Sequence, residues 1–325
     1  MRIVSLFSGA GGFDLGLIKA GHKIVFANDL DKDAIETYKT NIGNHVYLAD
    51  IREIPSTMIP PADVVIGGFP CQGFSLANLR RSTRDERNIL YEELVRVIKD
   101  IKPLYFLAEN VRGILSLGRG AVIRKIVNDL RQLGYRVETE LFNMADYGVP
   151  QHRWRVIIAG TRNDLPEELT YRFPQPTHGN LHDKKVKELF RRKMSPWITI
   201  GEALRHIPEP GCGSRRLKNH VCSKYKVTNR NFTGHRRTDP QKPSPTILAR
   251  GNGKGGVCAI QHPNNHRRLT IRESAIVQTF PLNFEFVGSM NSCYRQVGNA
   301  VAVKFAQALG KQLKTLENRI PRHLQ

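Results

Sequence analysis

Short apolar runs alternate with amphipathic stretches through the first half of the chain. Runs such as residues 3–7 and 64–67 have the length and composition of buried strands. Repeated strand–helix alternation predicts an α/β fold with a doubly wound, mostly parallel sheet. Ligands of such sheets bind at the carboxyl ends of the strands. The expected strands are residues 3–7, 24–28, 46–49, 64–67, 105–108, 137–142 and 155–160, and the expected helices are 13–20, 32–41, 90–99, 120–133, 271–280 and 301–313.

The pattern weakens after about residue 172, where Pro, Gly, His and basic residues become more frequent. The whole chain has a formal net charge of +21. Residues 175–270 hold 20 Lys and Arg against 5 Asp and Glu, a net charge of +15. Positive charge concentrated in one segment predicts a polyanionic partner, most often nucleic acid. We therefore expect a catalytic and cofactor-binding domain over 1–172, a smaller recognition domain over 173–285, and a segment 286–325 that returns to the first domain.

Cysteine usage and the N-terminus bear on the compartment and on metal binding. The five cysteines are irregularly spaced, which disfavours a disulfide framework and suits reduced thiols in the cytoplasm. No signal sequence and no apolar stretch of membrane-spanning length is visible. The spacing of Cys212, His220 and Cys222 does not fit a zinc site, so we expect no metal. The lack of a membrane-spanning stretch leads us to expect no membrane partner.

A glycine-rich turn follows the first expected strand, in the run Phe7-Ser8-Gly9-Ala10-Gly11-Gly12. The dinucleotide pattern G-x-G-x-x-G would need glycine at position 14, where Asp14 stands, so a nicotinamide dehydrogenase is disfavoured. Asp29 ends the second strand and could bind ribose hydroxyls. Asp50 ends the third and could accept a hydrogen bond from an adenine amino group. These features suit S-adenosylmethionine, and the structural alternative is a turn with carboxylates that cap helices.

A second turn, Gly67-Gly68-Phe69-Pro70-Cys71-Gln72-Gly73-Phe74-Ser75, follows the fourth strand. It places the Cys71 sulfur at the carboxyl edge of the sheet. A thiolate there would be a strong nucleophile if nearby positive charge lowered its pKa. The alternative is an inert buried cysteine, but Pro70 marks a rigid turn rather than a core position.

The run Phe69-Pro70-Cys71-Gln72 resembles the signature of the cytosine-5 DNA methyltransferases of bacterial restriction–modification systems. Further resemblances follow in the order of that family's motifs and span nearly the whole chain. The departures are Asn88, where the family often has glycine after the arginine of its fifth motif, and Thr279, where it often has glycine. The matching runs are Phe7–Gly12, Glu109-Asn110-Val111, Gln151-His152-Arg153-Trp154-Arg155, Arg268-Leu269-Thr270-Ile271-Arg272-Glu273, Gln278-Thr279-Phe280-Pro281 and Gln296-Val297-Gly298-Asn299-Ala300-Val301.

This resemblance implies methyl transfer from S-adenosylmethionine to carbon 5 of a flipped cytosine. It implies that Cys71 adds to carbon 6 and that Glu109 contacts ring nitrogen 3 and the amino group. Arg153 would hold the cytosine carbonyl oxygen, and Arg155 would brace the loop or a phosphate. The implied cofactor contacts are Phe7, Gly9, Gly11, Gly12, Asp29, Leu30, Asp50, Ile51, Pro70, Leu90, Asn299 and Val301.

The resemblance also implies double-stranded DNA as the partner. A loop over residues 77–88 would close on the DNA, although a solvated charged loop would show the same charge pattern. The expected DNA contacts are Ser75, Arg80, Arg81 and Arg84 around this loop, and Thr246, Arg250 and Asn252 in the recognition segment.

Two other functions stay open on the same scaffold. One is a tRNA cytosine-5 methyltransferase, against which the long basic segment argues. The other is a catalytically inactive DNA-binding regulator, against which Cys71, Glu109 and Arg153 argue. The main hypothesis places the protein in the cytoplasm of a bacterium, on the nucleoid through its DNA. It implies a monomer with a cognate restriction endonuclease encoded nearby.

Overall fold

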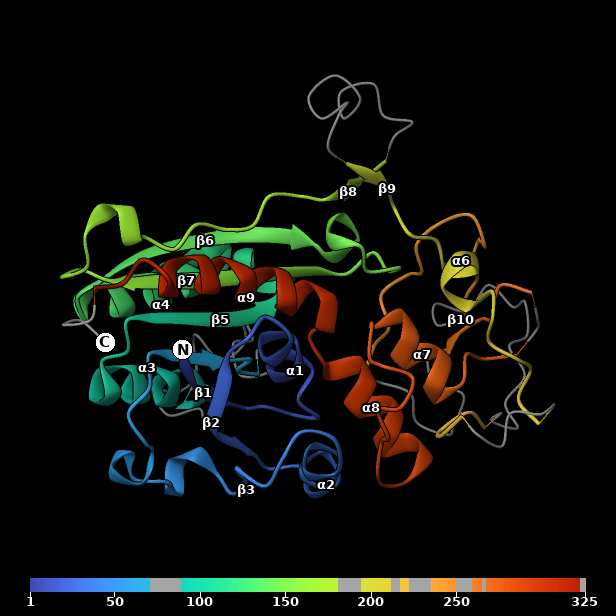
Figure 1. The fold of residues 1–325 in the computed structure, drawn as a ribbon, viewed down its shortest axis with the longest axis horizontal. Helices are drawn as coiled ribbons and strands as arrows, with labels where there is room; N and C mark the ends of the chain where they lie inside the picture. Colours follow the sequence, from blue (N-terminus) through green and yellow to red (C-terminus); the bar gives the residue numbers. More distant parts are fainter. Residues whose placement is uncertain are drawn as a thin grey trace.

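A computed structural model describes residues 1–70, 89–180, 194–211, 217–221, 235–249, 259–264 and 267–321 (Figure 1). Its centre is a seven-stranded sheet in the order β3-β2-β1-β4-β5-β7-β6. Strand β7 runs antiparallel to both β5 and β6, and the remaining pairs are parallel. The predicted doubly wound, mostly parallel sheet is therefore confirmed. The strands are β1 (Arg2–Leu6), β2 (Lys23–Asp29), β3 (Val46–Leu48), β4 (Val64–Gly67), β5 (Tyr105–Val111), β6 (Tyr135–Asn143) and β7 (Trp154–Arg162).

Helices cover both faces of this sheet because consecutive strand residues alternate between two apolar layers. Tyr105 and Leu107 pack with α1 and α9 on one face, whereas Phe106 and Ala108 pack with α3 and α4 on the other. The helices are α1 (Gly12–Lys19), α2 (Lys32–Asn41), α3 (Ile89–Ile101), α4 (Ala121–Gln132), α6 (Ile200–Leu204), α7 (Ile271–Val277), α8 (Met290–Asn299) and α9 (Val303–Glu317). Short 3-10 turns are η1 (Ile51–Glu53), η2 (Ser56–Met58), η3 (Arg112–Leu115), η4 (Leu117–Gly120), η5 (Met144–Tyr147) and η6 (Glu167–Leu169).

A third apolar cluster lies beside the sheet and joins α6, α7 and α8 (Figure 1). It combines Ile200 and Ile247 with the aromatic side chains of Phe280, Phe284 and Phe286. Two-stranded ladders pair β8 (His178–Gly179) with β9 (Ser195–Pro196), and β10 (His235–Arg236) with β11 (Ala259–Ile260). The division of the chain at residues 172 and 285 stays a prediction.

Helix α8 was not expected from the pattern of apolar positions. Its buried residues include Ser292, Gln296 and Gly298, which do not produce an apolar stripe in the sequence. Gln296 is instead held by hydrogen bonds, since its Oε1 accepts from Thr37 and its Nε2 donates to the Val287 carbonyl. Polar burial of this kind is decided by the tertiary partners.

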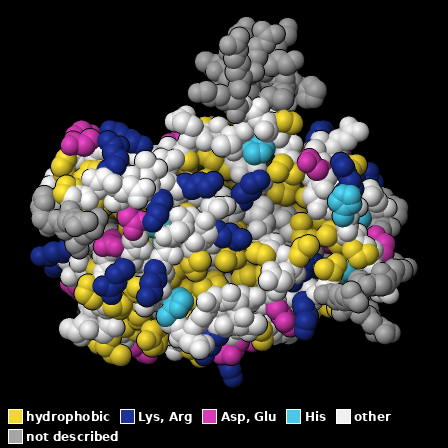
Figure 2. Space-filling view, viewed as in Figure 1, with side chains coloured by type: hydrophobic (Ala, Val, Ile, Leu, Met, Phe, Trp, Pro, Cys, Tyr) yellow, Lys and Arg dark blue, Asp and Glu magenta, His cyan; other side chains and the backbone are white. Residues whose placement is uncertain are grey.

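Helices α1 and α9 cross at a distance that only glycine allows. A Cβ atom at Gly16 would lie 2.3 Å from the Ala306 Cβ and 2.6 Å from the Val303 carbonyl oxygen. One at Gly310 would lie 2.7 Å from the Ala20 Cβ. This contact matters for the site because α9 directly follows the segment that approaches the glycine turn. In the view of Figure 2, Lys and Arg side chains gather near the middle of the face that α9 crosses.

We predict that Gly16→Ala destabilises the protein by about 1–3 kcal/mol, because the clash is with backbone and cannot relax by a rotamer change. Gly113→Ala is the matched control, since a Cβ atom there meets nothing within 4 Å. Urea unfolding measures both variants. Equal unfolding midpoints for the two would contradict the close approach of the helices.

Candidate active site at the carboxyl edge of the sheet

The candidate catalytic carboxylate, Glu109, lies near the end of β5 and is 8% exposed. In the ladder, Glu109 pairs with Ile157 and Val111 pairs with Arg155, so Glu109 and Arg155 are diagonal neighbours on one face. The Arg155 Nε lies 2.6 Å from the Glu109 Oε1. Oε1 nevertheless receives no hydrogen bond of good geometry from the described residues. This oxygen is shielded from solvent, and the Arg155 guanidinium faces it.

The same strand end positions the turn that leads to the candidate nucleophile. A Cβ atom on Gly68 would lie 3.5 Å from the Glu109 Oε2, so the carboxylate lies next to that backbone. The Asn110 Nδ2 donates to the Phe69 carbonyl at 3.0 Å. Two adjacent residues of β5 thus contact the chain just before Pro70, which is exposed. Cys71 lies outside the described residues, as do Ser75, Arg80, Arg81 and Arg84.

Arg153 has a different environment from the one expected of it. It is fully buried, and its Nη1 donates to the Ile247 carbonyl at 2.8 Å. Its Nη2 donates to the carbonyls of Gly298 and Ala300 at 2.9 and 3.0 Å. Burial lowers the pKa of this guanidinium well below its usual range, and neighbouring Arg155 adds to the effect.

These bonds argue against the expectation that Arg153 holds the cytosine carbonyl oxygen, which stays a prediction. Its two Nη atoms are engaged with backbone, and its Nε, which has no partner among the described residues, is shielded from solvent. The arginine that lies beside the catalytic carboxylate is Arg155. Sequence spacing cannot separate these two arginines. Residues two apart would share one face of a continuous strand, but β7 begins at Trp154, so Arg155 lies in the ladder opposite Val111 and Arg153 lies just outside it.

Two glutamines, Gln151 and Gln278, connect the same segments that Arg153 connects. The Gln151 Nε2 donates to the Gln278 Oε1 at 2.8 Å, and the Gln151 Oε1 accepts from the Ile247 backbone at 2.8 Å. Gln278 also donates to the carbonyls of Val297 and Ala300. Both glutamines are fully buried, which explains why glutamine stands at these positions. Their partners were not foreseen from the sequence.

The three expected DNA contacts of the recognition segment are described only in part. Thr246 is partly exposed, and its hydroxyl donates to the His152 carbonyl at 2.6 Å. Any contact of Thr246 with a base would therefore use its methyl group or its remaining acceptor capacity. Arg250 and Asn252 lie outside the described residues.

The glycine turn has the backbone that its composition predicts. Gly9 and Gly11 have φ angles of +53° and +82°, in the left-handed region that favours glycine. The Gly9 N–H donates to the Asp29 Oδ2 at 2.7 Å, and burial raises the pKa of that carboxyl. A Cβ atom on Gly12 would lie 2.5 Å from the Val301 carbonyl oxygen. The structure thus brings together expected cofactor residues from both ends of the chain.

The remaining expected cofactor residues differ in exposure. Leu30 follows Asp29 and is 61% exposed, which offers an apolar surface at the strand end. Asp50 caps η1, and both of its oxygens accept hydrogen bonds from Arg52, which holds the pKa of the carboxyl low. The capping alternative therefore holds for Asp50, although its ionised oxygens keep further acceptor capacity. Phe7 is half-buried with a φ of 56°, Ile51 is buried in the core, Leu90 is half-buried on α3, and Asn299 is exposed at the end of α8.

Asp14 is not free to act as a ligand group. It is fully buried behind the glycine turn, where its oxygens accept from Ser5 and Tyr38 at 2.7 Å each. The Tyr38 hydroxyl also lies 3.1 Å from the His45 Nε2. Burial raises the pKa of Asp14 to about 6, against the hydrogen bonds that lower it.

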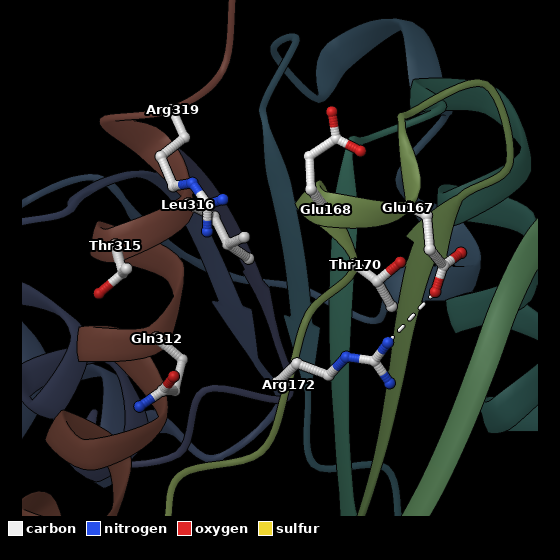
Figure 3. Close-up of a pocket in the computed structure, with 8 residues that line it drawn as sticks. All are labelled: Glu167, Glu168, Thr170, Arg172, Gln312, Thr315, Leu316 and Arg319. Atoms are coloured by element: carbon white, nitrogen blue, oxygen red, sulfur yellow. Dashed lines mark hydrogen bonds and ion pairs between the residues drawn. The ribbon is translucent and has the colours of Figure 1, made fainter.

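One cavity, of about 600 Å³, lies between the segment after β7 and the end of α9 (Figure 3). Side chains after β7 and from the last turns of α9 line it, among them Arg172, Thr170 and Arg319. Arg172 pairs there with Glu167 at 3.1 Å. It contains no residue of the glycine turn, of β5 or of the Pro70 turn, so its chemistry differs from that of the candidate site. The described residues contain no helix that could cross a membrane and no cluster of three or more metal-binding side chains.

The fold alone is shared with solved structures of low sequence identity. A prophage-encoded protein from E. coli, assigned as a DNA modification methyltransferase, superposes with a TM-score of 0.75 at 24% identity, over 98% of this chain and 99% of its own. The S. pombe Dnmt2 methyltransferase superposes with a TM-score of 0.69 at 22% identity, over 97% of this chain and 99% of its own. The sheet with its antiparallel β7 therefore belongs to a fold that these two proteins share.

Sequence comparison specifies the family. The model of the C-5 cytosine-specific DNA methylases matches residues 1–315. The Type II methyltransferase M.NgoFVII of Neisseria gonorrhoeae is 36% identical over 334 residues, which cover 96% of this chain and 86% of that protein. M.BspRI of Lysinibacillus sphaericus is 37% identical over 359 residues, which cover 96% of this chain and 81% of that protein. The chain belongs to the C-5 cytosine-specific DNA methylase family and is a DNA cytosine-5 methyltransferase.

We predict that the stability of the wild-type protein relative to Asp14→Asn increases by about 1 kcal/mol between pH 7 and pH 5. The folded carboxyl, with its pKa of about 6, binds a proton more readily than the unfolded one, so this group adds stability as the pH falls. Urea unfolding of both proteins at the two pH values measures the difference. A difference that stays constant or reverses contradicts the buried position of the carboxyl.

We predict that Arg153→Lys lowers the free energy of unfolding by about 2–4 kcal/mol, because one ammonium cannot reach three carbonyls held by a planar guanidinium. Arg155→Lys, whose Nζ can still pair with Glu109, should cost about 1 kcal/mol or less. Denaturant unfolding of both variants provides the test. Equal losses would mean that Arg153 does not join the three segments.

Proposed function

We propose that this methyltransferase transfers a methyl group from S-adenosylmethionine to carbon 5 of a flipped cytosine in a short, specific sequence of double-stranded DNA. The observation that carries the proposal is the Glu109–Arg155 pair, which lies against Gly68 at the turn that leads to Cys71. A carboxylate, a guanidinium and a cysteine turn at one sheet edge are the groups that covalent activation of a pyrimidine needs.

The residues at the carboxyl ends of β1 and β2 suit S-adenosylmethionine. The backbone of Gly9 is open, since a Cβ atom there meets nothing within 4 Å, and Asp29 is fixed beside it by the Gly9 N–H. Asp29 would bind the ribose hydroxyls, and exposed Leu30 would contact the adenine ring. When bound, the cofactor supplies an electrophilic methyl group on a sulfonium.

Carbon 5 of cytosine is a weak nucleophile, and the residues of this chain would activate it. The Cys71 thiolate would form a bond to carbon 6, which turns the ring into an enamine. Glu109 would contact ring nitrogen 3 and the amino group, and so withdraw electron density from carbon 6. Once carbon 5 of the enamine has taken the methyl group, with the electrons of the broken bond left on the donor sulfur, loss of the carbon 5 proton to a base would return the electrons that break the bond to Cys71 and release it.

We assign the contact with the cytosine carbonyl oxygen to Arg155 rather than to Arg153. Arg155 is the guanidinium within reach of Glu109, and it is partly exposed, whereas Arg153 donates both Nη atoms to backbone. A guanidinium there would also stabilise negative charge on the ring during the attack of the thiolate.

The basic segment supports duplex DNA as the partner. Its +15 charge over residues 175–270 suits contacts with phosphates, and the Thr246 region connects directly to the catalytic sheet through the His152 carbonyl. Arg250 and Asn252 would read bases, and Ser75, Arg80, Arg81 and Arg84 would contact the backbone. A tRNA substrate would be the alternative on the same active site.

The named relatives are Type II methyltransferases, which supports a role in restriction–modification. Methylation would then protect the host DNA from a cognate endonuclease encoded nearby, with no stable complex between the two enzymes. A monomer in the bacterial cytoplasm fits this role, because one flipped base needs one active site.

We predict that Cys71→Ser abolishes methylation, since an alkoxide forms far less readily than a thiolate at neutral pH. Cys293→Ser is the matched control. Cys293 is 2% exposed, its Sγ donates to the carbonyls of Phe286 and Gly288, and a serine hydroxyl can take over these bonds. Bisulfite sequencing of DNA from expressing cells measures modification and also reads out the target sequence.

A second measurement tests the covalent step. DNA that contains 5-fluorocytosine should trap the wild-type and Cys293→Ser proteins as covalent complexes, because fluorine cannot leave as the proton does. Cys71→Ser should give none. Full modification by Cys71→Ser, or trapping through another residue, would overturn the assignment.

A further inference from the structure

Two side chains at the carboxyl edge of the sheet have no part in the chemistry above. Arg112 directly follows β5, and Trp154 is the first residue of β7. The Arg112 guanidinium carbon lies 5.7 Å from the centroid of the Trp154 ring. A guanidinium at this distance from an indole face is held by a cation–π attraction.

Strand alternation explains why these two side chains meet. Glu109, Val111 and Arg155 share one face of the sheet, so Trp154 extends from the other, and Arg112, the first residue of η3, reaches the Trp154 ring there. The β5–β7 edge therefore presents an acid–arginine pair on one face and an arginine–tryptophan pair on the other. Both pairs lie within three residues of each other along each strand.

The Arg112–Trp154 pair is exposed and carries an uncompensated charge. Trp154 is 40% exposed, and Arg112 is also exposed. Throughout the described ranges, no carboxylate lies within ion-pair distance of Arg112 and no hydrogen bond engages its guanidinium. Space is open beside it, because a Cβ atom on Gly113 would meet nothing within 4 Å. The N–H donors of the Arg112 guanidinium are thus available to an anion.

We propose that Arg112, held by Trp154, binds a backbone phosphate of the target DNA strand next to the extruded cytidine. The inference rests on the proposed function, because Glu109 fixes where the base must lie. Three residues of strand separate Glu109 from Arg112, about 10 Å at 3.3 Å per residue. This is comparable to the reach from the pairing edge of a nucleotide to the phosphates that flank it.

The indole explains why arginine suits this position. Stacking restricts the guanidinium before DNA arrives, so less side-chain entropy is lost when its fork engages two phosphate oxygens. Trp154 is in this account a positioning residue, and Arg112 makes the contact with the substrate. The contact comes from the catalytic sheet itself and adds to those expected from the basic recognition segment.

The first test is the salt dependence of DNA binding by Arg112→Ala. One lost phosphate contact should weaken binding of the cognate duplex roughly tenfold near 0.1 M salt. It should also reduce the slope of log K against log salt concentration by about 0.9. Arg319→Ala is the control, since it removes the same charge from an exposed position that lines the cavity near the end of α9. Its slope should equal that of the wild type.

The second test identifies the phosphate. Duplexes that carry one neutral methylphosphonate on either side of the target cytosine should weaken wild-type binding at one of the two positions. The Arg112→Ala variant should bind this duplex no more weakly than the unmodified one, because the arginine that would contact the phosphate is already absent. Trp154→Phe should retain most of the affinity, and Trp154→Ala should lose several-fold but add nothing to Arg112→Ala.

Binding of S-adenosylmethionine serves as the check on folding and should be the same in all of these variants. The inference is overturned if Arg112→Ala keeps the wild-type salt slope, or if its losses add to those of the methylphosphonates at both positions. In either case the wild-type protein would still methylate cytosine. Failure of the proposed function would instead appear as absence of cytosine methylation in the wild-type protein.

Discussion

The buried guanidinium of Arg153 joins three parts of the chain on which the site depends. It donates to the carbonyl of Ile247 in the recognition segment, to that of Gly298 near the end of α8 and to that of Ala300 just after α8. A buried charge is costly unless it is hydrogen-bonded, and here three backbone carbonyls accept from the two Nη atoms. The result is a fixed relation between the catalytic sheet, the segment that carries Thr246 and the chain that passes Gly12.

Because both Nη atoms of Arg153 donate to backbone carbonyls, we assign the contact with the base to the neighbouring arginine. Arg155 lies within β7, whereas Arg153 precedes it, and the diagonal of the antiparallel ladder brings Arg155 to Glu109. A parallel β7 would have changed this pairing. The antiparallel direction of β7 therefore sets which arginine meets the Glu109 carboxylate.

The carboxyl edge also collects groups from distant parts of the sequence. The glycine turn after β1 meets the chain near Val301, and Asn110 of β5 fixes the Phe69 carbonyl beside β4. Each contact is short-ranged, but each joins segments that the sheet order makes neighbours. The order β1-β4-β5-β7 is therefore what turns separate motifs into one site.

The sequence by itself determined the fold class, most strand and helix positions, and the family. Apolar periodicity and glycine or proline turns are local properties, and they can be read without knowledge of the partners. It also indicated which side chains carry chemistry, including Glu109 and the glycine turn. Three outcomes were decided only by the tertiary structure. Arg153 is buried with its guanidinium donating to backbone carbonyls, Asp50 accepts hydrogen bonds from Arg52, and α8 forms with a buried polar face. Those outcomes depend on which atoms the fold brings within hydrogen-bonding distance, and spacing along the chain does not contain that information.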